Sequence, residues 1–203
     1  FCNLINLTGT NRYQQISRIP LMIGMDAEWG LGMRLDSCIE FPKQITLGAI
    51  QDNSYVEKFG EEVGRQCKRL GIHINFAPSV DVNTNPKNPI INYRSFGESQ
   101  YNVAEKGAMY IKGMKKYNVM GSAKHFPGHG DTGTDSHYDL PLISHNRTRL
   151  DSLELYPYRE LIKNGLQGWL EDKIHALVDP PISRLSVRLI PLEEGTNRGI
   201  VVI

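Results

Sequence analysis

Cysteine is scarce and scattered in this 203-residue sequence, which contains only Cys2, Cys38 and Cys67. An odd number of widely separated cysteines without a C-x-x-C pair supports neither a dense disulfide framework nor a zinc site. We therefore expect buried structural thiols, and we expect no metal ion and no other cofactor.

Long hydrophobic runs and a strong net charge are also missing. No apolar run approaches the roughly 18 residues that a membrane-spanning helix needs, so we expect no membrane partner. A formal net charge of +1 gives no general reason to expect a polyanionic partner such as nucleic acid. The first residues lack a basic segment followed by an apolar one, and the compartment therefore stays open.

Short apolar runs alternate with segments of helical spacing. The runs at residues 20–25, 72–77 and 119–123 are predicted to be strands, and each delivers polar residues at its carboxyl end. Apolar spacing predicts a helix from Ser54 to Gly71, with Ser54 and Glu57 as a capping box, and a second helix over 103–118. Pro157 and Gly165 bracket a third helix over 157–164.

This alternation predicts an α/β fold of the (β/α) TIM-barrel type, but an incomplete one. Eight β-α units usually take about 250 residues and rarely fewer than about 200, whereas the regular alternation ends near Gly168. We therefore assign residues 1–168 to a partial barrel and infer that part of the barrel is missing. Residues 169–203 are predicted to form an unrelated tail, with a short helix over 169–178 followed by a β-hairpin.

The segment KHFPGHGDTGTDSHYDLP, residues 124–141, combines histidines, aspartates and a lysine in a loop rich in Gly and Pro. Lys124 and His125 end the third predicted strand, where parallel α/β folds build their active sites. Asp135 and His137 lie two positions apart, so in an extended segment both side chains point the same way. The carboxylate can then hold one imidazole nitrogen while the other nitrogen faces a substrate.

This loop resembles, nearly letter for letter, the signature of bacterial family 3 glycoside hydrolases of the β-N-acetylglucosaminidase type. Three further segments are similar to motifs of that family: MDAEWG at 25–30, FAPSVDVNTNP at 76–86 and NYRSFG at 92–97. The resemblance covers roughly residues 10–168, and it implies that the first strand and helix of the barrel are missing. It also implies a carbohydrate substrate, and retaining hydrolysis of glycans that contain N-acetylglucosamine, such as peptidoglycan fragments.

The resemblance also implies roles for individual residues. The sugar next to the scissile bond would be held by Asp26, Arg94, Lys124 and His125, with Asp81 as a helper. The acid/base would be His137, oriented by Asp135, because an imidazole with an ordinary pKa near ~6.5 exchanges protons close to neutral pH. Trp29 would cover the apolar face of the sugar ring.

The nucleophilic aspartate of the family is not assigned to any residue. After Gly168 the only aspartates are Asp172 and Asp179, and neither lies in the expected context at the end of a strand. We therefore expect this chain to be a poor catalyst or none. A catalytically inactive sugar-binding fragment is one alternative. A second is a nucleic-acid-associated protein, because the tail weakly resembles AlbA-like domains of Schlafen-type bacterial proteins.

Overall fold

The computed structural model describes residues 4–133, 141–143, 145–166, 168–171, 175–176, 186–189 and 200–202. The helices are α1 (Leu4–Ile16), α2 (Gln44–Gly48), α3 (Ser54–Arg69), α4 (Gln100–Lys115), α5 (Arg147–Ser152) and α6 (Tyr156–Lys163), with 3-10 helices η1 (Leu31–Met33) and η2 (Asn92–Arg94). The strands are β1 (Met22–Met25), β2 (Ile74–Asn75), β3 (Met120–Phe126), β4 (Leu142–Ile143), β5 (Gly168–Glu171), β6 (His175–Ala176), β7 (Ser186–Leu189) and β8 (Ile200–Val202).

Four strands form a parallel sheet in chain order. Gly24 of β1 lies beside Ile74 of β2, Ile74 lies beside Met120 of β3, and Ser122 of β3 lies beside Gly168 of β5. The full order is β7-β5-β3-β2-β1-β8, and a separate small sheet pairs β4 with β6. Consecutive parallel strands joined through helices are the organisation of (β/α) folds.

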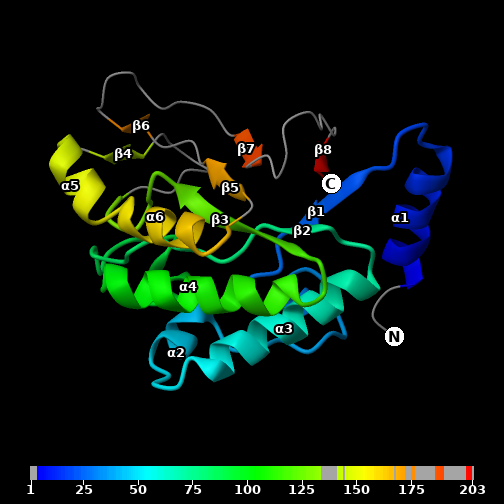
Figure 1. Ribbon diagram of the computed structural model, residues 1–203, viewed down its shortest axis with the longest axis horizontal. Helices are drawn as coiled ribbons and strands as arrows, with labels where there is room; N and C mark the ends of the chain where they lie inside the picture. Colours follow the sequence, from blue (N-terminus) through cyan, green and yellow to red (C-terminus); the bar gives the residue numbers. More distant parts are fainter. Residues whose placement is uncertain are drawn as a thin grey trace.

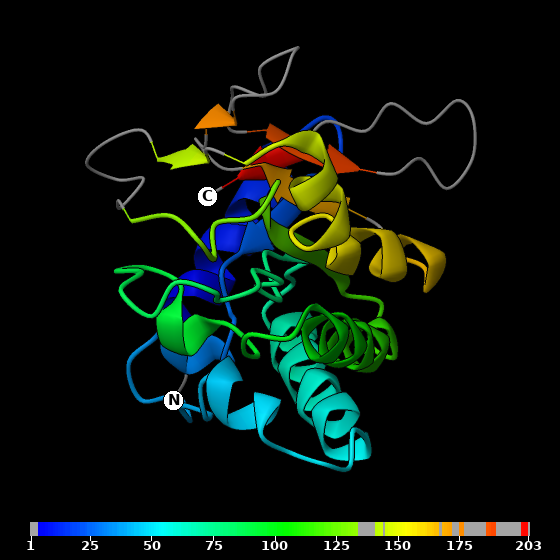
Figure 2. The ribbon, with the colours of Figure 1, turned by 90° about the vertical axis from the view of Figure 1, so that its left-hand side faces the viewer.

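The helices that connect these strands pack together on one side of the sheet. Figures 1 and 2 show α3 and α4 side by side, with α6 next to α4. Glycines allow α3 and α4 to approach backbone to backbone, since a Cβ atom on Gly60 would lie 2.2 Å from the Tyr110 carbonyl oxygen. A Cβ atom on Gly113 would lie 2.1 Å from the Glu57 carbonyl oxygen. This close approach fixes α4, which in turn supports the ends of β1 and β2.

The predicted strands and helices of residues 20–166 are confirmed. The helices predicted from Ser54, over 103–118 and over 157–164 are α3, α4 and α6. Gly71 and Gly165 follow two of them with φ of +72° and +85°, the left-handed conformation that glycine accepts readily. The capping box is wrong: Asn53 is the N-cap of α3, and its side chain makes no capping bond to the helix but accepts from Lys106 Nζ at 2.5 Å. The Asp52 carboxylate instead accepts from the Ser54 N–H at 2.9 Å.

The predicted helix over 169–178 is also wrong, because β5 and β6 occupy described parts of it. β5 pairs in parallel with β3, so the hydrogen-bonding edge of β3 overrides the local helical pattern. The strands expected near 185–189 and 200–203 are present as β7 and β8, but they do not form a hairpin. β7 pairs antiparallel with β5, and β8 pairs parallel with β1.

The cysteines differ from one another. Cys67 is a buried free thiol, as expected, and burial raises its pKa to about 12. For Cys38 the expectation of a buried thiol is wrong, because this residue is half-buried and disulfide-bonded.

Among the described helices, none is both long and apolar enough to cross a membrane.

Candidate active site

Charged side chains from three β-α units meet at the carboxyl edge of the parallel strands. Asp26 and Glu28 follow β1, Asp81 follows β2, and Lys124 and His125 belong to the last part of β3. Arg94 ends η2, in the connection between β2 and α4. The predicted convergence of Asp26, Arg94, Lys124 and His125 at one edge is therefore observed.

Buried polar residues hold the segments that carry this edge. The turn after β1 is fixed by Asn75, which accepts from the Ala27 N–H at 2.9 Å, and by the Tyr110 hydroxyl, which donates to the Glu28 carbonyl at 3.1 Å. The segment after β2 bonds to β3, since Val80 N–H donates to the Lys124 carbonyl at 2.7 Å. Hydrogen bonds between neighbouring segments therefore fix the backbone that carries the side chains of this edge.

Glu28 lies at the centre of the ionic contacts, although sequence reasoning missed it. Its side chain is fully buried, with 0% exposed, and accepts hydrogen bonds from two Arg94 nitrogens, Nε at 3.0 Å and Nη2 at 2.6 Å. The Lys124 ammonium lies 2.8 Å from the same carboxylate. A bidentate arginine pair of this kind is one of the stronger polar contacts in proteins.

Two effects of the surroundings act on the Glu28 carboxyl. Burial alone would raise its pKa, but the charges and hydrogen bonds of Lys124 and Arg94 outweigh burial and lower the pKa to about 2. Glu28 is therefore ionised at neutral pH. A signal for it did exist in the sequence: it lies two positions after Asp26, so it shares a direction with Asp26 in an extended segment.

Asp26 is the most accessible acid of the edge, with 31% of its side chain exposed. Its two oxygens take different cations: Oδ1 accepts from Lys124 Nζ at 2.5 Å, and Oδ2 accepts from Arg34 Nη2 at 2.8 Å. Burial opposes the ionised form, yet Lys124 and Arg34 together lower the Asp26 pKa. Arg34 is a second residue that sequence reasoning missed.

His125 connects Arg94 with Asp81. The Arg94 Nη2 lies 3.1 Å from His125 Nε2, and Asp81 Oδ2 lies 2.7 Å from His125 Nδ1. A guanidinium only donates, so Nε2 must accept, and Nδ1 then carries the proton that it donates to Asp81. The contacts therefore make Nδ1 the nitrogen that donates to Asp81.

Asp81 lies behind His125 and has no exposed surface. Its carboxylate also accepts from the His129 N–H at 2.6 Å and from the Ser79 hydroxyl at 2.8 Å. Burial would raise its pKa, but His125 and the His129 N–H outweigh burial and hold the pKa well below the usual range. Buried in this way, Asp81 can position His125 but has no surface to offer a ligand.

Acid is expected to destabilise the folded chain through these carboxyls. Glu28 and Asp81 have ordinary pKa values of 4.5 and 3.8, and folding lowers both. Their contribution is therefore complete above pH 4.5 and is lost as the pH falls toward the folded values, by a few kcal/mol for Glu28. Urea unfolding at several pH values should show this decline. Replacing the exposed Asp52 with Asn should change it much less, and a flat profile over the acid range would contradict the buried, ionised Glu28.

The remaining predicted residues fall into two groups. One face of the Trp29 ring is covered by Lys43, whose ammonium lies 3.4 Å from a ring centroid, so that face is not free for a sugar. Asp135 and His137 lie outside the described residues, as do Asp172 and Asp179. Their roles stay predictions.

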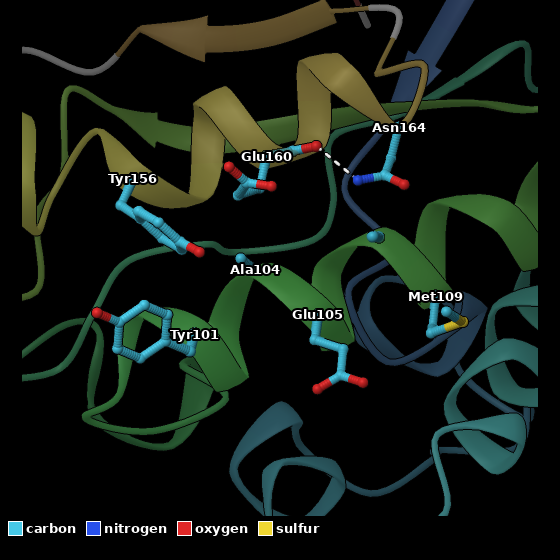
Figure 3. Close-up of a pocket in the computed structure, with 8 residues that line it drawn as sticks. Tyr101, Ala104, Glu105, Met109, Tyr156, Glu160 and Asn164 are labelled. Carbon is cyan, nitrogen blue, oxygen red and sulfur yellow. Dashed lines mark hydrogen bonds between the residues drawn. The ribbon is translucent and has the colours of Figure 1, made fainter.

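A groove of about 230 Å³ lies away from this edge, between α4 and α6. Figure 3 shows the Tyr101 and Tyr156 rings at one end of it, with Glu105 and Glu160 along its sides. The two rings meet edge to face at 5.1 Å between centroids. None of the charged residues of the carboxyl edge lines this groove, so it is separate from the candidate active site.

A parallel α/β sheet whose strand ends gather acids, cations and an imidazole is the arrangement of (β/α)-barrel enzymes. Comparison with known families is specific: the glycosyl hydrolase family 3 N terminal domain matches residues 3–175. The chain belongs to glycoside hydrolase family 3, and it has the TIM-barrel-like α/β fold of that domain. The match extends beyond residue 168, and the resemblance of the tail to AlbA-like domains is not borne out.

Several relatives are named as hexosaminidases. Beta-hexosaminidase A of Pseudoalteromonas piscicida is 38% identical over 173 residues, which are 83% of this chain and 29% of that protein. Beta-hexosaminidase LpqI of Mycobacterium tuberculosis is 36% identical over 155 residues, which are 74% of this chain and 39% of that protein. This chain thus spans between 29% and 39% of these two relatives.

Two solved structures of related enzymes are similar to this chain in both sequence and fold. A family 3 beta-N-acetylglucosaminidase from Paenibacillus sp. str. FPU-7 has 37% identity and a TM-score of 0.76, over 84% of this chain and 34% of that chain. NagZ from Neisseria gonorrhoeae, in complex with N-trifluoroacetyl-D-glucosamine, has 25% identity and a TM-score of 0.77, over 86% of this chain and 54% of that chain.

Proposed function

We propose that this chain supplies the sugar-binding part of a β-N-acetylhexosaminidase that acts on glycans containing N-acetylglucosamine, such as peptidoglycan fragments. The observation that carries the proposal is the single ionic cluster formed by Asp26, Arg94, Lys124 and His125 at the carboxyl edge of β1 and β3. The names of the hexosaminidase relatives support this substrate class.

Each residue of the cluster has a distinct part in this proposal. Asp26 is the exposed acceptor for sugar hydroxyl groups, and Lys124 and Arg94 are donors whose charges Glu28 balances. His125 lies beside the sugar position with its Nε2 bonded to Arg94, and Asp81 holds the ring from behind. Asp81 is thus a positioning residue in our proposal, acting through His125.

The catalytic step is proposed to use His137 as acid/base, with Asp135 orienting its imidazole. Retaining hydrolysis also needs a nucleophile that attacks the anomeric carbon. We assign that role to no residue of this chain, because Asp172 and Asp179 lack the expected context at the end of a strand. This favours a second candidate function, sugar binding without efficient turnover.

Binding can be tested without turnover. Ligand-observed NMR should detect N-acetylglucosamine on the 203-residue chain. Replacing Lys124 with Met should weaken binding at least about tenfold, because a hydrogen bond to a charged group contributes roughly 1.5–3 kcal/mol. The matched control is Lys58→Met, which removes an exposed ammonium from α3.

Two results would contradict the proposal. One is equal sugar affinity in the Lys124→Met and Lys58→Met variants, with circular dichroism showing that both are folded. The other concerns catalysis: hydrolysis of an aryl β-N-acetylglucosaminide at the rate of a full-length relative would contradict the expected poor turnover. In that case Asp172 and Asp179 would become the candidate nucleophiles.

A further inference from the structure

A second group of ionisable residues lies where the turn after β3 meets α5 and α6. Asp131, His145 and Glu154 each offer a ligand atom, and these atoms all lie within 4.8 Å of one another. The His145 Nε2 contacts an Asp131 carboxylate oxygen directly. None of these three residues belongs to the ionic cluster of Asp26, Arg94, Lys124 and His125.

Glu154 is the unusual member of this group. Only 4% of its side chain is exposed, yet neither carboxylate oxygen has a hydrogen-bond donor. Buried carboxylates in folded proteins almost always have donors or a bound cation. Gly128 leaves room for Glu154, since a Cβ atom at Gly128 would lie 2.9 Å from the Glu154 Cβ. The carboxylate therefore lies near Asp131 and His145 with an ion pair to Arg149, 3.3 Å from Oε1, but without a hydrogen-bond donor on either oxygen.

We propose that Asp131, His145 and Glu154 form a binding site for Zn²⁺. One imidazole nitrogen and two carboxylate oxygens are ligands that zinc accepts, whereas Mg²⁺ and Ca²⁺ favour oxygen ligands alone. Three protein ligands leave a fourth position for water. This site departs from the expectation of no metal ion, which was based on cysteine spacing and took no account of this cluster.

Arg149 lies next to two of the proposed zinc ligands, so its removal is expected to strengthen zinc binding. Its Nη2 lies 3.3 Å from Glu154 Oε1 and 3.8 Å from Asp131 Oδ2, so the guanidinium and a zinc ion compete for the same carboxylates. The Arg149 side chain is 38% exposed and can turn toward solvent. Zinc binding would also break the direct contact between His145 Nε2 and the Asp131 carboxylate, because Nε2 must offer its lone pair to the metal.

The experiment measures zinc affinity of the 203-residue chain, freed of metal by chelation, by isothermal titration calorimetry. The visible spectrum of Co²⁺ in place of zinc reports the ligand geometry. His145→Ala, Asp131→Asn and Glu154→Gln should each lower the affinity at least about tenfold, since even outer partners of ligands contribute 10–100-fold. Arg149→Met should raise the affinity. Asp151→Asn, the matched control on α5, should leave it unchanged.

His137 is the competing zinc ligand, eight positions before His145 in the sequence. Binding that is kept in His145→Ala but lost in His137→Ala would overturn the assignment, as would equal affinity in His145→Ala and the parent chain. A fall in affinity on Arg149→Met would also count against it. His145 is partly exposed, so its variant is the one least affected by misfolding, and circular dichroism checks each variant.

Discussion

Replacing Glu28 with glutamine should destabilise the folded chain by about 3–5 kcal/mol, the usual effect of removing one partner from a buried ion pair. The variant keeps the shape of the side chain but leaves Arg94 and the almost fully buried Lys124 with less balancing charge. Urea unfolding at neutral pH measures the loss. The matched control is Glu40→Gln, which removes an exposed partner of Lys43 and should change stability by about 1 kcal/mol or less.

A double variant separates charge from packing. Adding Lys124→Met to Glu28→Gln removes one of the unbalanced cations, so part of the lost stability should return. If packing were the cause, the second substitution would lower stability further. A loss in Glu28→Gln no larger than in Glu40→Gln would show that Glu28 is not the centre of the charge network.

Replacing His137 with alanine should lower hydrolysis of substrates with poor leaving groups by roughly 10²–10⁴-fold, the usual contribution of general acid catalysis. The proposed function assigns no nucleophile to this chain, so the measurement uses a fusion with a relative's segment that carries one. Activated aryl glycosides should be affected much less, because their leaving group departs without a proton. Asp135→Asn should have the same pattern more mildly, since it weakens the orientation of the imidazole without removing it.

The ratio between the two substrate types decides this prediction. A His137 with only a structural role would lower stability and would reduce both rates alike. Equal losses on good and poor leaving groups would therefore remove His137 from the acid/base role. Thermal melting of each variant shows whether a change in folding contributes to the loss.

The sequence predicted the site best where a strand end and a motif coincide. Lys124 and His125 follow an apolar run, so both their position and their grouping with Asp26 could be predicted. Glu28 could not be recognised as the central acid, because its importance comes from two cations, Arg94 and Lys124, that are distant in the sequence. Only the folded chain shows that both reach one carboxylate.

The errors in the tail have a similar cause. The run WLEDKIHALV has an apolar spacing that suits a helix, yet its first residues pair with β3 as a strand. Local spacing reports what a segment could bury, and it contains no information about a free edge elsewhere in the sheet. The same limit applies at Ser54, where the neighbouring Asp52 supplies the bond that a capping box would have made.

The order of charges at the carboxyl edge has a consequence for selectivity. Three cations and three acids alternate there, Arg34, Lys124 and Arg94 with Asp26, Glu28 and Asp81, and their formal charges sum to zero. An uncharged polyol can form hydrogen bonds with this edge and leave its net charge at zero, whereas a carboxylated sugar would add an unpaired negative charge. Recognition at this edge is therefore expected to favour neutral sugars and to vary little with ionic strength, since screening weakens net charges more than closely paired ones.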